Sequence, residues 1–171
     1  MQFLSPAQCV GYVTFVLGVA AFLQTVDRRL KLLNGVQCIA YGIHFALLGN
    51  SAAAASSLVS SVRSFLSVRT RSPLLAALIV AINIVLGLVF SRGGAGWIPV
   101  IASSAATIAI FMLDGIPLRL VLLGCTVLWL VNNFLCRSVG GVLLESTIAV
   151  ASVTTILRLA AARTRMAARS A

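Results

Sequence analysis

Long apolar stretches dominate the chain, and short polar or glycine-containing segments separate them. The pattern predicts seven helices, each close to the length that crosses a lipid bilayer. The connections between them carry charged residues, Gly or Pro, which are typical of helix ends and turns. The predicted helices cover residues 6–26, 32–48, 51–68, 73–90, 97–113, 117–136 and 139–158.

The predicted helices differ in how their polar residues are distributed. Residues 73–90 are apolar on nearly every face, which suits a helix that lies mostly in lipid. Residues 51–68 are instead rich in Ala and Ser, and such small residues allow helices to approach closely. We therefore expect the third helix at the centre of a bundle and the fourth helix at its edge.

The composition indicates an all-α integral membrane protein. Of the 171 residues, 60% are hydrophobic and 9% are charged, whereas about a quarter of the residues in soluble domains are charged. The chain has 13 Lys and Arg against 3 Asp and Glu, a net charge of +10. A basic chain can bind nucleic acid, but these cations lie at the ends of apolar runs. We therefore expect lipid bilayer rather than nucleic acid around the protein.

The distribution of cations predicts an orientation, because cytoplasmic loops collect Lys and Arg. Seven spans with the N-terminus outside and the C-terminus inside place most cations on the cytoplasmic side: Arg28, Arg29, Lys31, Arg69, Arg71, Arg119, Arg158, Arg163, Arg165 and Arg169. Arg92 and Arg137 then lie outside, and Arg63 lies within a span. The helix lengths also admit six spans, but merging two neighbours puts basic clusters on both sides. We expect the basic tail to bind anionic lipid, worth about 1 kcal/mol per charge.

Several classes of protein are disfavoured by what the sequence lacks. The first apolar segment has neither a basic start nor a cleavage site, which predicts a retained helix. Catalytic and nucleotide-binding motifs are absent, so we expect no enzyme activity and no cofactor. One His and three acidic residues are too few for a metal site. The cysteines have no metal-type or redox-type spacing, and we expect each to pack as a small apolar residue: Cys9, Cys38, Cys125 and Cys136.

The two halves of the chain show a weak internal repeat. A shift of 91 residues pairs Arg28 with Arg119 and Ser61 with Ser152, whereas a shift of 88 pairs Tyr41 with Trp129 and His44 with Asn132. The pairs follow the order of the helices, which predicts a 3+1+3 arrangement of parallel repeats. The expected divisions are a first three-helix bundle at 1–72, a connector helix at 73–92, a second bundle at 93–160 and a basic tail at 161–171.

Short blocks throughout the chain carry a family resemblance. They are Asp27–Lys31, Gly42–Gly49, Val62–Ser64, Arg69–Ser72, Pro99–Ile101, Asn133–Phe134, and Ser138–Gly141 leading to Glu145. In these blocks the chain resembles the YgjV-type bacterial inner-membrane proteins. The resemblance implies a multi-pass position in the bacterial inner membrane and the SWEET-like, PQ-loop group of folds, which includes the PnuC transporters. The family pattern leads us to expect a histidine where this chain has Asn132, and the Pro-Gln pair is absent.

Polar side chains within the predicted helices are the candidate functional residues, because an ionisable group in a membrane span is costly. The helix directions bring a first group to one level near the outer side: His44, Asn132, Asn133 and Glu145, with Tyr41 and Trp129 about one turn deeper. A carboxylate that faces an imidazole and two amides can bind a polar solute or relay a proton. The same groups can instead pair only with one another and hold the two halves together.

A second group of polar residues lies nearer the predicted inner side. Arg63 shares a helix face with several serines, and Asn34, Gln37, Tyr41 and His44 share a face of the preceding helix. These faces predict a cavity wall or a path across the bilayer, although Arg63 can alternatively extend to the inner headgroups. We expect the hydroxyls at 103, 104, 107, 152 and 155 to bond their own helix backbones.

Two functions fit this pattern. The first is a small-solute transporter that alternates access between two three-helix bundles, for which a polar cavity between the bundles is expected. The alternative is a non-transporting inner-membrane scaffold or accessory protein, for which a closed and dry interior is expected. A homo-oligomer is compatible with both, and the sequence does not name a solute.

Overall fold

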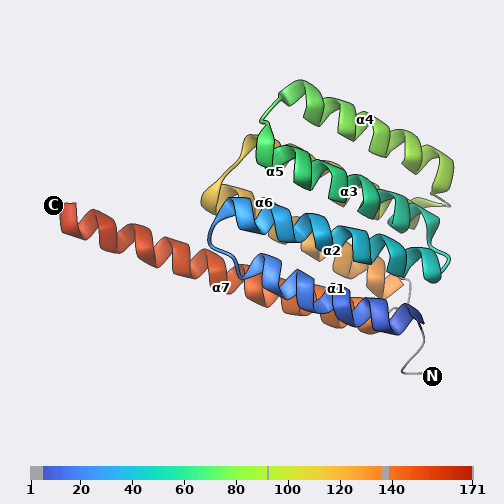
Figure 1. The fold of residues 1–171 in the computed structure, drawn as a ribbon, viewed down its shortest axis with the longest axis horizontal. Coiled ribbons are helices and arrows are strands. Elements are labelled where there is room, and N and C mark those ends of the chain that lie inside the picture. Colours follow the sequence, from blue (N-terminus) through green and yellow to red (C-terminus); the bar gives the residue numbers. More distant parts are fainter. Residues whose placement is uncertain (1–5, 92, 136–138, 171) are drawn as a thin grey trace.

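A computed structural model describes residues 6–91, 93–135 and 139–170 (Figure 1). In these ranges the chain is helical, with no strand. The elements are α1 (Pro6–Phe22), α2 (Asp27–Leu47), α3 (Ser51–Arg69), α4 (Pro73–Phe90), the 3₁₀ helix η1 (Gly94–Gly96), α5 (Trp97–Met112), α6 (Gly115–Leu135) and α7 (Val139–Ser170). The seven predicted helices are all present. The bounds differ most where α2 begins earlier, at Asp27, and where α7 continues to Ser170.

Local sequence explains several helix ends. The side chain of Asn50 accepts a hydrogen bond from the amide of Ala53 at 3.1 Å, and thereby caps the start of α3. Ser72 caps α4 in the same way, and Pro73 follows at the first position, where no backbone N–H is needed. Gly49 adopts a positive φ of 75°, a conformation that favours glycine and turns the chain out of α2.

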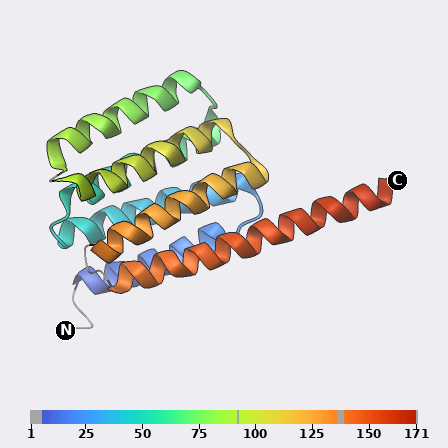
Figure 2. The same cartoon turned by 180° about the vertical axis from the view of Figure 1, so that it is seen from behind.

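Six of the helices form a closed ring. Each helix packs on the next in the order α1, α2, α3, α5, α6 and α7, and α7 packs back on α1. Helix α4 packs on α3 and α5 at the edge of the bundle (Figures 1 and 2). This is the edge position expected from its apolar sequence. The serine-rich α3 lies between α2, α4 and α5.

Specific contacts hold α4 and close the ring. Asn83 is fully buried in α4, and its Nδ2 donates to the Val100 carbonyl at 3.0 Å and to Ser104 Oγ at 3.1 Å in α5. Where α1 meets α7, a Cβ at Gly18 would lie 2.9 Å from Ile148 Cδ1, so a larger residue there would require the Ile148 side chain to shift. The ring is therefore closed by tight packing, and the connector is fixed by polar bonds.

The ring helices turn their polar sides inward and their apolar sides outward. On α3, Ser60 and Arg63 are buried, whereas Leu58 and Val62 are exposed. On α2, Val36, Ile39 and Ile43 form part of an exposed apolar stripe. A soluble bundle shows the reverse pattern, so these outer faces suit contact with lipid.

Four helical segments in the described ranges are long and apolar enough to cross a membrane: Pro73–Phe90, Gly94–Met112, Gly115–Leu135 and Gly140–Met166. Cys9–Phe22 is a shorter apolar helix. Helices α2 and α3 are lower in apolar content because of their polar inner faces. Their lengths are nevertheless similar, and the 21 residues of α2 span about 31 Å.

The starts of two helices are related by a spacing of 88 residues. Asp27, where α2 begins, corresponds to Gly115, where α6 begins. In the order of the helices, the contact between α3 and α5 corresponds to the contact between α7 and α1. A shift of 88 therefore relates α2 to α6, as the sequence favoured for these two helices.

One end of the bundle is fixed by a buried arginine. Arg119 of α6 is 2% exposed and forms an ion pair with Asp27 at the start of α2. Its Nη2 donates to the carbonyls of Gln24 and Thr25 at 3.0 Å each. Asp27 also accepts a hydrogen bond from the Gly115 amide at 2.8 Å. These bonds join the α1–α2 turn to the start of α6.

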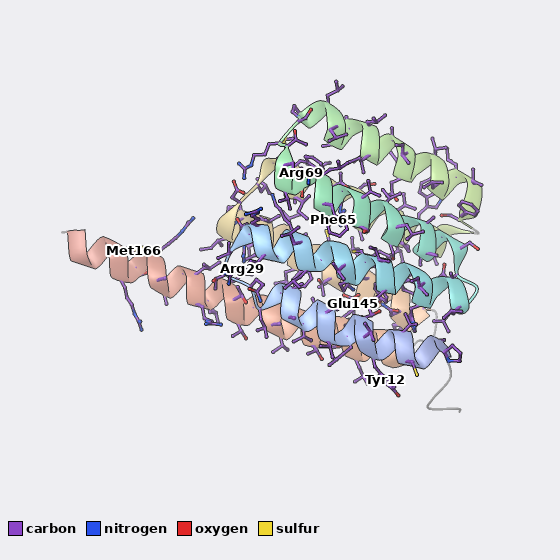
Figure 3. The ribbon with its side chains drawn as sticks, viewed as in Figure 1. Tyr12, Arg29, Phe65, Arg69, Glu145 and Met166 are labelled. Atoms are coloured by element: carbon purple, nitrogen blue, oxygen red, sulfur yellow. The ribbon has the colours of Figure 1, made fainter. Side chains whose placement is uncertain are left out.

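The same end carries further charged side chains on its surface. Arg71 and Asp114 form an exposed ion pair between the α3–α4 and α5–α6 turns. The hydrogen bond to Asp114, and secondly its charge, raises the pKa of Arg71. Arg29 and Arg69 lie at this end as well (Figure 3). The buried cations of the described ranges are Lys31, Arg63 and Arg119. Of these three, Arg63 lines the cavity inside the ring.

Candidate functional site

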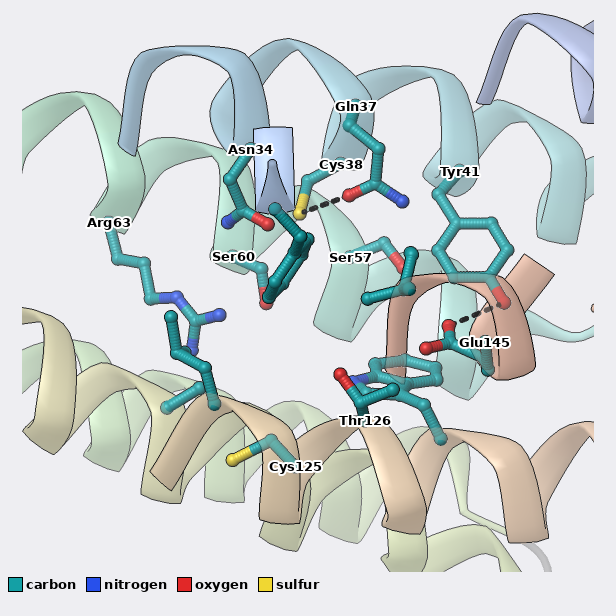
Figure 4. Close-up of a pocket in the computed structure, with 15 residues that line it drawn as sticks. Asn34, Gln37, Cys38, Tyr41, Ser57, Ser60, Arg63, Cys125, Thr126 and Glu145 are labelled. Atoms are coloured by element: carbon teal, nitrogen blue, oxygen red, sulfur yellow. Dashed lines mark hydrogen bonds between the residues drawn. The ribbon is translucent and has the colours of Figure 1, made fainter. Parts of the chain in front are cut away.

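A cavity of about 50 Å³ lies inside the ring (Figure 4). A buried water needs about 10–15 Å³ by this measure, so the cavity has room for a few water molecules. Side chains from α1, α2, α3, α5, α6 and α7 line it, and α4 contributes none of the lining residues. Its polar lining residues are Asn34, Gln37, Cys38, Tyr41, Ser57, Ser60, Arg63, Cys125, Thr126 and Glu145.

The cavity walls follow the spacing of 88 residues. The lining residues of α2 are Asn34, Gln37, Cys38 and Tyr41, and those of α6 are the four residues 88 positions later, Leu122, Cys125, Thr126 and Trp129. Ser57 and Ser60 of α3 correspond in the same way to Glu145 and Ile148 of α7. The counterpart of Arg63 is Ala151, which is not part of the wall. The two ionisable lining residues are therefore among the positions at which the halves differ, as are Asn34 and Ser60, whose counterparts are Leu122 and Ile148.

Arg63 is buried in the wall, at 5% exposure. Its Nη1 donates to the Ser103 carbonyl and to Thr107 Oγ1 at 3.0 Å, both on α5. Its Nε has no partner among the described residues. The ion pairs in the described ranges are those of Arg71 and Arg119, and neither involves Arg63. The guanidinium therefore points toward α5 inside the ring, and no acidic side chain of the described residues lies within ion-pair distance of it.

Glu145 lies at the other side of the cavity (Figure 4). Tyr41 donates from its hydroxyl to Glu145 Oε1 at 3.2 Å and accepts a hydrogen bond from Asn133 Nδ2 at 2.9 Å. The ring of Trp129 lies beside that of Tyr41, with 5.9 Å between their centroids. This cluster joins α2, α6 and α7, and so connects the two halves of the chain.

Neither His44 nor Asn132 forms a hydrogen bond with Glu145 in the described part of the chain. His44 Nδ1 lies 3.0 Å from the Ala7 carbonyl oxygen of α1, so the imidazole faces α1. Within the described ranges, Tyr41 is the residue that bonds Glu145. Asn132 is buried, and its Nδ2 has no partner in the described part of the chain. Arg137, which was expected on the outer side, lies outside the described residues, as does Cys136.

The polar faces of α2 and α3 meet in another part of the cavity wall. Asn34 Nδ2 donates to Ser64 Oγ at 2.9 Å, and Gln37 Oε1 accepts from Cys38 Sγ at 3.6 Å. The hydroxyls of Ser60 and Ser103 lie 2.8 Å apart across the seam between α3 and α5. Asn34 and Gln37 therefore belong to the same cavity wall as Arg63, as the spacing of polar residues along α2 predicts.

Several residues of the site were not singled out from the sequence. The hydroxyls of Ser103 and Thr107 were expected to bond their own helix backbones. Thr107 does so and also accepts from Arg63. The Ser103 hydroxyl instead pairs with Ser60, and the Ser103 carbonyl accepts from Arg63. Thr155 was given the same role, but it bonds the Phe22 carbonyl of another helix at 2.8 Å. Cys38, Ser57, Cys125 and Thr126 also line the cavity. Applying the shift of 88 to the polar positions of α2 finds Cys125 and Thr126.

A second hollow of about 260 Å³ lies between α1, α2 and α7. Its lining is mostly apolar and includes Phe15 and Leu144, together with the rings of Tyr41 and His44. Tyr41 lines both this hollow and the ring cavity. The hydrogen-bonded Tyr41 therefore stands between a polar interior and a larger, less polar space.

The described cysteines, Cys9, Cys38 and Cys125, are free thiols. No group of three or more His, Cys, Asp and Glu side chains that could hold a metal ion occurs within the described ranges. The chemistry of the site therefore comes from one guanidinium, one carboxyl, amides and hydroxyls. Such groups bind or orient polar molecules by hydrogen bonds and charge.

Comparisons with known proteins agree with the apolar outer surface. The sequence model of the Imp-YgjV family, described as bacterial inner membrane protein, matches residues 5–163. The chain is similar to the inner membrane protein YgjV of Escherichia coli (strain K12), with 31% identity over 152 residues, which cover 89% of this chain and 83% of that protein. No solved structure matches the chain. The chain therefore belongs to the YgjV family of multi-pass bacterial inner membrane proteins.

Proposed function

We propose that the protein is a small-solute transporter that works by alternating access between two three-helix units, α1–α3 and α5–α7. The observation that carries this proposal is the polar cavity inside the ring. Both units contribute to its walls, at positions related by 88 residues. Helix α4 supplies no lining residue and acts as the connector. Binding at the interface of two repeats is the usual plan of small transporters, including SWEET proteins.

We infer seven spans, with the N-terminus outside and the C-terminus inside. The outward apolar faces of α2 and α3 support their position in lipid. The clustering of cations at the end that contains Arg29 and Arg69 supports a cytoplasmic position for that end. A C-terminal fluorescent-protein fusion should be bright in cells, and a C-terminal alkaline-phosphatase fusion should be inactive. An active phosphatase fusion would contradict this orientation.

Movement of the two units relative to each other is expected at two seams, the helix–helix contacts that join the units. One seam joins α3 to α5 through Ser60, Ser103 and the Arg63 hydrogen bonds. The other joins α7 to α1 near Gly18. The bond between Tyr41 and Glu145 closes the cavity toward the second hollow. Breaking that bond would connect the two spaces on the outer side, while opening the α3–α5 seam would expose Arg63 to the inner side.

The extension of α7 provides a separate contact with the membrane. The helix projects beyond the bundle at the cation-rich end (Figure 2). Arg158, Arg163 and Arg165 are exposed along it. In the proposed orientation these side chains reach the cytoplasmic headgroups, where anionic lipid stabilises each charge by about 1 kcal/mol.

Osmotic swelling of proteoliposomes tests the proposed transport. Purified protein is reconstituted and mixed rapidly with a panel of small neutral, zwitterionic, anionic and cationic solutes, and swelling is followed by light scattering. At least one solute should enter faster than in vesicles without protein, and Glu145→Gln should slow it. Arg69→Gln is the matched control, since Arg69 is exposed at the end of α3. Entry of every solute at the protein-free rate would contradict transport and favour the scaffold.

A further inference from the structure

We infer that the solute bound in the ring cavity is a small zwitterion, with its acidic group on Arg63 and its basic group at Glu145. This inference rests on the proposed function and names the class of solute. Three observations lead to it: an incompletely bonded cation, a carboxyl group at the opposite side, and the contribution of one ionisable residue by each half.

The first observation concerns the buried guanidinium. Arg63 donates through Nη1, to the Ser103 carbonyl and to Thr107, and neither partner carries a charge. Its Nε has no partner in the described part of the chain, although the side chain is only 5% exposed. A buried charge without a counter-ion is costly, and a guanidinium presents paired N–H groups that match a carboxylate. The cavity therefore offers a site for a carboxylate-type anion at Arg63.

The second observation concerns the acidic residue that lines the same cavity. Glu145 is 4% exposed and accepts a hydrogen bond from Tyr41 at one carboxyl oxygen, Oε1. Figure 4 shows Glu145 and Arg63 on opposite sides of the cavity. Oxygen Oε2 receives no hydrogen bond from a described residue, so it is free to accept one from an ammonium group. The aromatic rings of Tyr41 and Trp129 lie beside this position and also favour a cation.

The third observation is the asymmetry of the wall. The position that corresponds to Glu145 in the first half is Ser57, and the position that corresponds to Arg63 in the second half is Ala151. Each half therefore supplies one ionisable group, a base from the first half and an acid from the second, at different levels. Ser57 and Arg63 are six residues apart on α3, so the two levels differ by about 9 Å. A molecule of the size of a short amino acid spans such a gap with one hydrogen bond at each end.

Single-tryptophan fluorescence tests this inference directly. The chain has two tryptophans, and Trp97→Phe leaves Trp129, which lines the cavity, as the only reporter. The full-length Trp97→Phe protein is titrated with glycine, β-alanine and γ-aminobutyrate. Each is compared with the acid that lacks its amine (acetate, propionate, butyrate) and with the amine that lacks its carboxylate (methylamine, ethylamine, propylamine).

At least one zwitterion should bind about tenfold or more tightly than both of its matched compounds. Arg63→Gln should weaken that binding about 10- to 100-fold, as expected when a hydrogen bond to a charged group is lost. Arg63→Lys, which keeps the charge, should restore part of it, and Arg69→Gln should leave it unchanged. If a matched acid or amine binds as tightly as every zwitterion, or if no zwitterion binds, the inference is overturned. Swelling by neutral solutes alone would overturn it too, while leaving transport in place.

Discussion

Two buried arginines in this protein have opposite surroundings. Arg119 is neutralised by Asp27 and donates from both terminal nitrogens to groups of the α1–α2 turn. Arg63 donates only through Nη1, to two neutral partners, and has a cavity beside it. The Nε of each arginine has no partner among the described residues. Both are almost fully buried, so burial does not distinguish them. The difference lies in charge compensation, from which we propose a role in the scaffold for Arg119 and a role in solute binding for Arg63.

The largest expected effect comes from breaking the compensated pair. Arg119→Gln leaves the Asp27 carboxylate without its cation and removes bonds to the α1–α2 turn. Removal of one partner of a buried ion pair costs about 3–5 kcal/mol. We expect a lower melting temperature and reduced accumulation in the membrane, measured by thermal denaturation in detergent. A second change, Asp27→Asn, should recover part of the loss, and wild-type stability of Arg119→Gln alone would contradict the scaffold role.

Substitution of Arg63 should have the opposite effect: a small change in stability and a large loss of solute binding. Arg63→Gln removes a buried charge that no acidic neighbour balances, so the free energy of unfolding should change by less than about 1 kcal/mol. Solute binding should weaken about 10- to 100-fold, because the charged donor is lost. Thermal denaturation and a fluorescence titration of the same sample measure the two effects. A loss of stability as large as that of Arg119→Gln would show that both arginines stabilise the fold to a similar extent, and would contradict the difference drawn between them.

A smaller effect is expected at the connector helix. Asn83→Leu removes two hydrogen bonds between α4 and α5, and such interhelical bonds contribute about 0.6 kcal/mol each in membranes. Stability should fall by about 1 kcal/mol, and solute binding should stay at the wild-type level because α4 supplies no lining residue. Denaturation and titration of this variant show whether polar bonds outside the cavity affect binding. Loss of binding would give α4 a role in the site.

The smallest effect is expected at the exposed ion pair. Arg71→Gln breaks the contact with Asp114 on the surface of the cation-rich end, where solvent and salt already screen it. The melting temperature should match that of the wild type, and the same should hold for a wild-type sample in high salt. A clear drop in melting temperature would show that the exposed Arg71–Asp114 ion pair stabilises the fold as strongly as the buried Arg119–Asp27 ion pair.

The sequence predicts the positions of the helices well because short segments of sequence are enough to define where a helix begins and ends. Apolar runs, Pro73 at the start of α4 and the glycine at Gly49 define helix positions without reference to the rest of the fold. The edge position of α4 also follows from its composition alone. The continuation of α7 to Ser170 had a weaker signal, because its basic residues fit either a helix or a solvated tail.

The candidate site is predicted in outline but not in its pairings. Polar spacing along α2 and α3 identified the residues of the wall, including Arg63 and Asn34. It did not predict that Glu145 bonds Tyr41, while His44 faces Ala7. Successive residues of a helix differ by about 100° in direction, so a small rotation of α2 decides which side chain meets α7. That rotation depends on packing between distant segments, which one sequence does not encode locally.

The central claim is that Arg63 acts on a solute and is dispensable for the scaffold. The most direct measurement is the solute-driven swelling rate of proteoliposomes that contain Arg63→Gln, normalised to folded protein and compared with Arg69→Gln. The account predicts swelling at or near the protein-free rate for Arg63→Gln and at the wild-type rate for Arg69→Gln. Wild-type swelling by well-folded Arg63→Gln would contradict it.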